Sequence, residues 1–347
     1  MRALSAIQLG PENPYVGFGA GARDLYTPVI PALEMPADYQ EGAKLPLGPE
    51  DMDMIRALEA DPNIIKSVGG NIINVMTYLS SHGLPMRFVG ALGVDDGAST
   101  AIRSHLNRFG IQDATVTKEG YQPSYSRIRR VEGKSREISG APRTPILEAV
   151  ERAEWAAHLR TAGAVGASSL NSLKLNSWIM EDTPEGTSIF YNPGGGEFRA
   201  YGPQLINIMH RRVRSGKGPV TGLALNDTEM MEMHGLFIAD MNEKYLRELA
   251  ENLTREHAGG VALRVLCTMD KAGFIIAENG DSQVYAAKVV EKPEDTTAAG
   301  DESNAANQMA MMEGLDPDCS AEVIREAGHL CVQHIGNTHR KPYALAA

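Results

Sequence analysis

Residues 295–301 (DTTAAGD) place two acidic and several small residues between a strand-like run, 284–290, and a helical run, 303–312. Small side chains let backbone amides approach a ligand, and amides at a helix N-terminus form an anion site. Such a site suits the charge that develops on a transferred phosphoryl group. A carboxylate at Asp301 could accept the proton of an attacking hydroxyl. The alternative is a plain strand-to-helix turn capped by Asp.

Two further segments carry groups suited to ligand binding. Gly69 and Gly70 open a helical run, and the side-chain amide of Asn74 can bind hydroxyls of a sugar-like ligand. Asn226 and Glu229 follow a strand-like run and offer oxygen atoms of the kind that hold magnesium through water. Each segment has a simpler interpretation, a helix begun by glycine in the first case and an Asn-capped helix in the second.

Strand-like runs alternate with helical runs along most of the chain, which predicts a largely parallel sheet covered by helices on both faces. Residues 97–109 predict one of the helices. In such folds ligands gather at the carboxyl ends of the strands, so residues that follow strands are candidates for function. The predicted strands are residues 87–92, 164–168, 188–191, 220–225, 262–269, 273–277 and 284–290.

Two regions break this alternation. Residues 27–62 are rich in Pro, Gly and acidic residues, and residues 124–138 alternate like a β-hairpin. We predict one α/β domain over residues 1–347, with a small β lid formed by about residues 25–66 and 112–140. An exposed strand edge on the lid would need covering, which makes the lid a candidate homodimer interface.

Taken together, these segments resemble the ribokinase-like (PfkB) family of carbohydrate and nucleoside kinases in type and in chain order. The GG-x-x-x-N signature is matched by residues 69–74, and the glycine-rich turn after the next strand by residues 89–97 (VGALGVDDG). The D-T-x-[GA]-A-G-D signature is matched by residues 295–301, and the N-x-x-E motif by residues 226–229. The resemblance covers nearly the whole chain and implies a three-layer sandwich with a β lid over the acceptor.

The resemblance implies an enzyme that transfers the γ-phosphate of ATP to a hydroxyl of a sugar or a nucleoside. Asp301 would be the catalytic base, with Ala298, Ala299 and Gly300 forming the anion hole. Glu229 would organise Mg²⁺ through water, and Asp295 and Thr297 match positions that bind K⁺ in some members. The implied substrate-binding residues are Asp24, Gly69, Gly70, Asn74 and Arg136, and the implied nucleotide-binding residues are Asn192, Asn226, Thr268 and Gly273.

Three residues depart from the family pattern. Glu302 follows Asp301 where a small or hydroxyl residue is usual, and Ser303 stands in place of the next aromatic residue. Asp270 replaces the first glycine of the nucleotide loop. Extra negative charge beside the phosphate could slow the transfer. The alternative function is therefore a catalytically weak protein that binds a ligand or a partner on the same fold.

Composition disfavours several other classes of protein. The formal net charge of -11 disfavours nucleic-acid and anionic-membrane partners, which require a basic surface. The chain lacks an apolar run of about 18 to 20 residues and a signal-peptide pattern, so we expect a cytoplasmic protein. The three cysteines are widely spaced and predict buried thiols rather than a disulfide framework or a zinc site.

A third class, the NAD-dependent oxidoreductases, would need a G-x-G-x-x-G turn between a strand and a helix. Residues 17–21 (GFGAG) are rich in glycine, but Ala22 occupies the sixth position. No amphipathic helix is expected to begin there. The sequence therefore disfavours a dinucleotide site.

Overall fold

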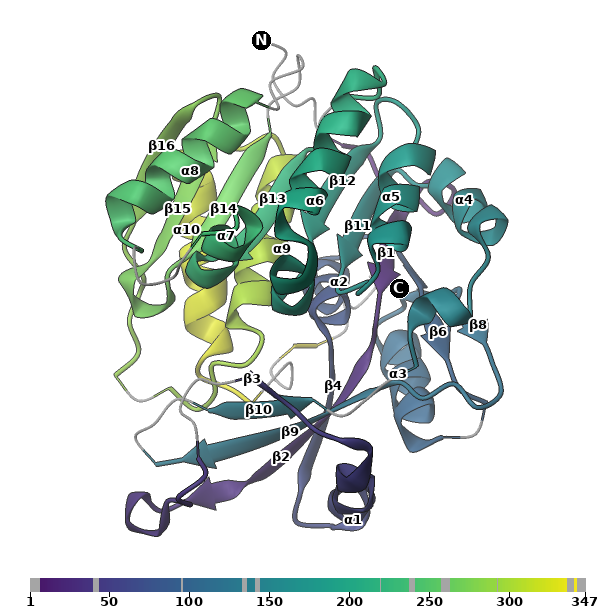
Figure 1. The fold of residues 1–347 in the computed structure, drawn as a ribbon, viewed down its shortest axis with the longest axis vertical. Coiled ribbons are helices and arrows are strands. Elements are labelled where there is room, and N and C mark those ends of the chain that lie inside the picture. The colour runs from purple at the N-terminus through teal and green to yellow at the C-terminus, as the bar shows by residue number, and fades with distance from the viewer. Residues whose placement is uncertain are drawn as a thin grey trace.

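The computed structural model describes residues 7–39, 44–94, 96–132, 136–140, 144–218, 220–236, 241–256, 263–291, 293–335 and 340–341. Figure 1 shows helices on both sides of a large sheet, with a smaller sheet lying across the lower part of the molecule in this view. The expected α/β class, a large mostly parallel sheet with a small second sheet, is confirmed. Within the described ranges, no helix is both long enough and apolar enough to cross a membrane.

The large sheet of the described chain has nine strands in the order β16-β15-β14-β13-β12-β11-β1-β5-β7. Two antiparallel strands, β15 (Phe274–Glu278) and β16 (Asp281–Tyr285), complete one edge. Because the other strands run parallel, their carboxyl ends meet at one edge of the sheet. The parallel strands are β1 (Tyr15–Gly19), β5 (Met86–Val89), β7 (Gln112–Asp113), β11 (Ala164–Ser168), β12 (Ser188–Asn192), β13 (Gly222–Asn226) and β14 (Arg264–Thr268).

Alternate residues of the central strands feed two apolar clusters, one on each face of the sheet. Phe18 of β1 lies in the first cluster, whereas Tyr15 of the same strand lies in the second. The helices of the first face are α4 (Arg152–Arg160), α5 (Leu173–Asp182), α6 (Gly195–Arg214), α7 (Asp227–Met233) and α8 (Glu243–Glu256). The helices of the second face are α2 (Asn71–Ser81), α3 (Gly97–Arg108), α9 (Ala299–Met312) and α10 (Pro317–Cys331).

Most of the predicted strands form, with their ends shifted by one or two residues. The expected strand at residues 87–92 is divided into β5 and β6 (Ala91–Leu92), and β6 pairs with β8 (Val116–Thr117) in a separate sheet. The expected strand at residues 284–290 is wrong beyond Tyr285. Asn279 and Gly280 both have left-handed backbone (φ 57° and 86°) and form a two-residue hairpin turn. That turn fixes the last strand at 281–285.

The small sheet has the strand order β3-β10-β9-β2-β4. Its β9 and β10 pair antiparallel, as the hairpin pattern predicts. Residues 112–117 lie in β7 and β8 instead, outside this sheet. The remaining short helices are η1 (Ala32–Glu34), η2 (Pro49–Asp51) and η3 (Ile146–Glu148). The five strands are β2 (Ala22–Ile30), β3 (Lys44–Pro46), β4 (Ile65–Gly69), β9 (Ser124–Val131) and β10 (Glu137–Gly140).

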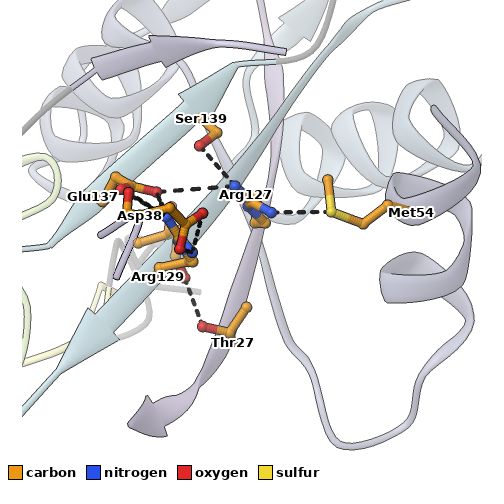
Figure 2. Close-up of polar contacts among 8 residues, drawn as sticks. Thr27, Asp38, Met54, Arg127, Arg129, Glu137 and Ser139 are labelled. Atoms are coloured by element: carbon orange, nitrogen blue, oxygen red, sulfur yellow. Dashed lines mark hydrogen bonds and ion pairs between the residues drawn. The ribbon is translucent and has the colours of Figure 1, made fainter. Parts of the chain in front are cut away.

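Helix α1 (Met52–Ala60) covers one face of the small sheet through a small apolar cluster of Leu25, Ile55 and Ile64. The same face carries the ion pairs drawn in Figure 2. Arg129 donates hydrogen bonds of 2.7 and 2.8 Å to the two carboxylate oxygens of Glu137, which is fully buried. Arg127 bonds to Ser139 and to the sulfur of Met54 on α1. Charge therefore helps to hold this sheet together.

The three cysteines are free thiols. Cys267 and Cys331 are buried, as expected, and burial raises the pKa of both thiols. Cys319 is exposed, contrary to expectation, because it lies on the first turn of α10, where its amide binds the capping Asp316 side chain.

Candidate active site

The first part of the site forms where α2 meets α9. Asn74 lies in the first turn of α2, and its Nδ2 donates a 2.7 Å hydrogen bond to Oδ2 of Asp301 in the first turn of α9. These residues are 227 positions apart in the chain. Gly70 begins α2 with φ 98°, a backbone conformation that glycine adopts without strain. The predicted Asn74 and Asp301 are therefore in direct contact.

The N-terminus of α9 is open at the position predicted for an anion. Ala298 precedes the helix in a left-handed conformation, with φ 68°. The amide of Ala299 makes a long, 3.4 Å bond to the carbonyl of Thr296. A Cβ built on Gly300 would meet no atom within 4 Å. The backbone at Gly300 is therefore accessible to a ligand, and the helix dipole favours a negative charge there.

Asp24 approaches this place from the small sheet. It lies on β2, where alternation along the strand directs it away from the face that α1 covers. The pKa of Asp24 is raised to about 7, mainly by burial and also by the neighbouring carboxylates Asp295 and Asp301, while a hydrogen bond from Ser126 opposes the shift. A Cβ on Gly69 would stand 2.1 Å from Asp24 Oδ2, so glycine leaves room for this carboxyl.

The predicted nucleotide residues lie at the carboxyl ends of adjacent strands. Asn192 ends β12 and pairs in register with Ser168 of β11, and Asn226 ends β13 and pairs in register with Thr268 of β14. The Oδ1 atom of Asn192 and the Oγ atom of Ser168 are buried without a hydrogen-bond partner. Buried polar atoms of this kind are rarely left unpaired, so these two point to a ligand or to water at the edge of the sheet.

Asn226 and Glu229 form a capping box at the start of α7. The amide of Glu229 donates to Asn226 Oδ1 at 2.8 Å, and the amide of Asn226 donates to Glu229 Oε2 at 2.9 Å. The simpler interpretation, a helix cap, is thus correct for both residues. The other carboxylate oxygen of Glu229 lies 3.4 Å from a Cβ built on Gly195, at the start of α6. One carboxylate oxygen of Glu229 therefore caps α7, while the other lies near the N-terminus of α6.

Sequence reasoning missed the residues at which the start of α6 approaches α2 and the end of β11. Gly194 precedes α6 with φ 85°, and a Cβ placed there would approach Ser169 Oγ at 3.0 Å and Asn71 Nδ2 at 3.2 Å. Asn71 lies on α2, one turn before Asn74. The run of three glycines, 194–196, was the available signal, because closely spaced glycines before a helix often allow a close backbone approach.

The loop from Thr268 to Gly273 is a tight turn between β14 and β15. It contains a short 3-10 helix, η5 (Asp270–Ala272), and Gly273 has φ 113°. A Cβ on Gly273 would stand 2.0 Å from the carbonyl oxygen of Tyr285. Asp270, which replaces a glycine of the family pattern, has φ 50°. Asp tolerates this left-handed conformation better than most residues, so the loop can form without glycine at this position.

Two arginines, one in β9 and one directly before β10, reach the turn before α9. The Nη1 atom of Arg136 bonds to the hydroxyl of Thr296. Arg130 is buried, and its Nη1 lies 3.5 Å from a carboxylate oxygen of Glu294. Arg136 was predicted and Arg130 was missed, because β9 carries arginines at 127, 129 and 130 and the sequence does not show which of them faces this turn.

The strand ends offer oxygen donors suited to a hydrated divalent cation, whereas the oxygen donors of the turn before α9 are paired with one another. Glu229 and the unpartnered Asn192 Oδ1 are oxygen donors of the kind that hold hydrated magnesium. Asp295 Oδ1, in contrast, accepts hydrogen bonds from both the amide and the hydroxyl of Thr297, at 2.9 and 2.7 Å. This pair closes the turn on itself. We therefore derive no step through potassium.

The glycine-rich N-terminal segment has a packing role. Gly17 and Gly19 lie within β1, and a Cβ on Gly17 would stand 2.3 Å from the sulfur of Met76 on α2. A Cβ on Gly19 would stand 2.3 Å from the carbonyl of Ser168. These glycines let α2 and β11 pack closely on β1. The chain then continues into β2 instead of a helix, so the geometry of a dinucleotide-binding turn is not present here.

Comparisons with known proteins identify the fold. No protein-family model and no curated protein sequence matches the chain. A probable sugar kinase from Rhizobium etli is 16% identical with a TM-score of 0.71, and 96% of each chain is covered. Ribokinase from Arabidopsis thaliana, complexed with ribose and ATP, is 18% identical with a TM-score of 0.69, covering 95% of this chain and 96% of that one.

Adenosine kinase from Anopheles gambiae, in complex with P1,P4-di(adenosine-5) tetraphosphate, is 14% identical with a TM-score of 0.76. The match covers 95% of this chain and 98% of that one. The chain therefore has the ribokinase-like fold, which sugar and nucleoside kinases share.

Proposed function

We propose that this protein is a kinase that transfers the γ-phosphate of ATP to a hydroxyl of a sugar or a nucleoside. One observation carries the proposal. Asn74 holds the carboxylate of Asp301 at the N-terminus of α9, beside the open backbone of Gly300. A carboxylate beside an anion site is the arrangement that phosphoryl transfer to a hydroxyl requires.

On the acceptor side, Asp24 and Asn74 would bind and orient the hydroxyl groups of the substrate. The reacting oxygen attacks the γ-phosphorus, its proton passes to Asp301, and the bond from the γ-phosphorus to the bridging oxygen of ADP breaks. The amides of residues 298–300 would stabilise the charge on the transferred group. Most of the rate enhancement would come from positioning and electrostatics.

On the donor side, ATP would lie along the strand ends at Asn192, Asn226 and Thr268, with the turn at Gly273 beside it. Glu229 and Asn192 would hold a magnesium ion through its water ligands. When bound, magnesium neutralises charge on the phosphate oxygens. Arg136, bonded to Thr296 next to the anion site, adds positive charge from the small sheet.

Two departures from the family pattern are compatible with this function. Glu302 forms an ion pair with Arg340, so its charge beside Asp301 is compensated. Asp270 adopts a left-handed conformation, which glycine also adopts without strain. These observations favour a kinase over a protein that binds a ligand without turnover. The plant ribokinase structure contains ribose and ATP, and an adenosine kinase structure from Schistosoma mansoni contains adenosine and AMP. Pentoses and nucleosides are therefore the first acceptors to test.

The test is ADP release from ATP and magnesium against a panel of sugars and nucleosides. We expect acceptor-dependent release that falls by about 10²- to 10⁴-fold in Asp301→Asn, the range for loss of a general base. Thermal unfolding of the variant would serve as the folding control. Full activity of Asp301→Asn would reject Asp301 as the base. Silence across the panel, with binding of ATP still detectable, would favour the binding protein.

A further inference from the structure

Arg340 lies against the two helices that form the catalytic pair. Its Nε donates a 3.2 Å hydrogen bond to Glu302 Oε1, and its Nη2 bonds to Glu302 Oε2. The guanidinium also stacks over the ring of Tyr78, 4.4 Å from the ring centroid. The side chain of Glu302 is 1% exposed and that of Arg340 is 12% exposed. This is a forked, nearly buried ion pair with a cation–π contact.

The two residues that Arg340 contacts are neighbours of the catalytic pair. Glu302 directly follows Asp301 on α9, and Tyr78 lies one helical turn after Asn74 on α2. Arg340 thus connects the same two helices that the hydrogen bond between Asn74 and Asp301 connects. A group that holds both helices at this point fixes the distance between Asn74 and Asp301.

The surroundings of Glu302 are rich in acidic groups. Asp295 comes from the turn before α9 and Asp301 from the same helix turn, while Glu313, directly after α9, acts on Tyr78 together with Glu302. Cys331 of α10 faces Glu302, Asp295 and Asp301 as well as Arg340, and burial with these charges raises its pKa. On α2, burial raises the pKa of Tyr78 to about 12, with Arg340 opposing the shift. Arg340 supplies positive charge to this acidic group.

We propose that Arg340 is a positioning residue of this site: it neutralises Glu302 and clamps α2 to α9, so that Asp301 is held on Asn74 as a carboxylate. The inference rests on the proposed function for its effect on turnover, but its structural part stands on the contacts alone. Without Arg340, Glu302 would lose this forked ion pair while remaining buried next to a second carboxylate. Such a pair retains a proton to higher pH.

The kinetic test is the pH profile of kcat/KM in Arg340→Ala. We expect the acidic limb to move up by about 1 pH unit, because the site then holds a proton that Asp301 must lose. Activity at pH 6 should fall about tenfold, with the loss shrinking as the pH rises. The double variant Arg340→Ala/Glu302→Gln should return the limb to its original position. Arg340→Lys should keep the limb but recover kcat only in part, since lysine lacks the fork and the planar stacking.

A second measurement needs no activity. The difference in unfolding free energy between Asp301→Asn and its parent, followed from pH 4 to 9, reports the protonation of Asp301 in the folded protein. We expect this pH dependence to shift upward in the Arg340→Ala background and to return when Glu302→Gln is added. Arg152→Ala is the matched control: Arg152 forms a forked surface pair with Asp182, on helices distant from α2 and α9, and should shift neither profile.

The outcomes separate the two proposals. If the wild-type protein releases no ADP with any acceptor, the kinase function fails, and the unfolding measurement still decides the role of Arg340. If Arg340→Ala loses activity by the same factor at every pH, and Glu302→Gln does not restore the profile, Arg340 is only a structural tether and the inference is wrong. An unchanged unfolding profile in the Arg340→Ala background would also overturn it.

Discussion

The large sheet and the small sheet are stabilised in different ways. Two extensive apolar clusters cover the faces of the large sheet, with side chains such as Trp155, Phe18 and Phe190 fully or almost fully buried. The cluster under α1 has only Leu25, Ile55 and Ile64 at its centre. In the small sheet, ion pairs add to this small apolar cluster: the buried Glu137 carboxylate lies between Arg127 and Arg129 (Figure 2).

This difference bears directly on the site, because each sheet positions a different part of it. Asp301 and the strand ends belong to the apolar body, whereas Asp24 lies in the small sheet and Arg136 lies directly before its strand β10. Packed apolar cores deform little. Removing one partner of a buried ion pair leaves the other charge buried and uncompensated, which destabilises the surrounding structure. We therefore expect damage to the body to appear as lost stability, and damage to the small sheet to appear as lost binding of the acceptor.

The largest effect is expected from Glu137→Ala. Removing this carboxylate takes the shared counter-charge from the partly buried Arg129 and Arg127, although Arg129 keeps its ion pair with the exposed Asp38. Breaking a buried pair costs about 3 to 5 kcal/mol, and we expect a loss near the lower end of that range. Because β9 pairs with β2 at Asp24, the acceptor KM should rise about tenfold or more while kcat changes less. Steady-state kinetics and hydrogen exchange in the small sheet would measure both effects.

Phe190→Ala provides the matched comparison in the body. It removes a buried ring from the centre of the large sheet, which should lower the free energy of unfolding by about 3 to 5 kcal/mol, similar to the loss expected from Glu137→Ala. We expect a lower unfolding temperature with an unchanged acceptor KM in the protein that remains folded. If Phe190→Ala raised KM as much as Glu137→Ala, the two sheets would not position the site independently.

Asp24→Asn tests the burial of charge on the small sheet. The pKa of Asp24 rises from 3.8 to about 7 on folding, so the folded protein binds a proton there that the unfolded chain releases. Wild-type stability should therefore fall as the pH rises from 4 to 7, by up to about 4 kcal/mol at 1.36 kcal/mol per unit of pKa. The asparagine variant lacks this loss.

Chemical denaturation of both proteins at pH 4.5 and pH 8 gives the measurement. The variant should be more stable than wild type at pH 8, and the pH-dependent part of the difference should shrink to about 1 kcal/mol at pH 4.5. It should also bind the acceptor more weakly, because it lacks the carboxylate that holds the hydroxyls. A stability difference that did not depend on pH would contradict a raised pKa at Asp24.

The smallest effect on stability is expected from Gly300→Ala. Its added Cβ meets no protein atom within 4 Å, so the free energy of unfolding should change by less than about 1 kcal/mol. A phosphate bound to the amides of this turn would meet the methyl group, and kcat/KM should fall tenfold or more. Gly69→Ala is the contrast, because its Cβ would displace Asp24 and should raise the acceptor KM. Full activity of Gly300→Ala would contradict the proposal that this turn binds the phosphate.

Much of the site could be predicted because its parts follow strands. Asn192, Asn226 and Thr268 are far apart in the sequence, yet each ends a parallel strand, and the geometry of a parallel sheet brings such ends to one edge. The strand at 284–290 was misjudged because apolar residues outweighed the Asn279-Gly280 turn signal. Asp95, part of the glycine-rich turn at 89–97, lies outside the described residues, as does the hairpin tip at 133–135.

The sequence by itself determined the order of strands and helices, the open glycine turn before α9 and the carboxylate that follows it, because these depend on local residue types and on periodicity. Only the tertiary structure decided that Arg340 pairs with Glu302, that Glu137 is buried between arginines, and that burial raises the pKa of Asp24. A charged residue has no periodic signature that identifies its partner. Its partner and its energy depend on which distant segments exclude water around it.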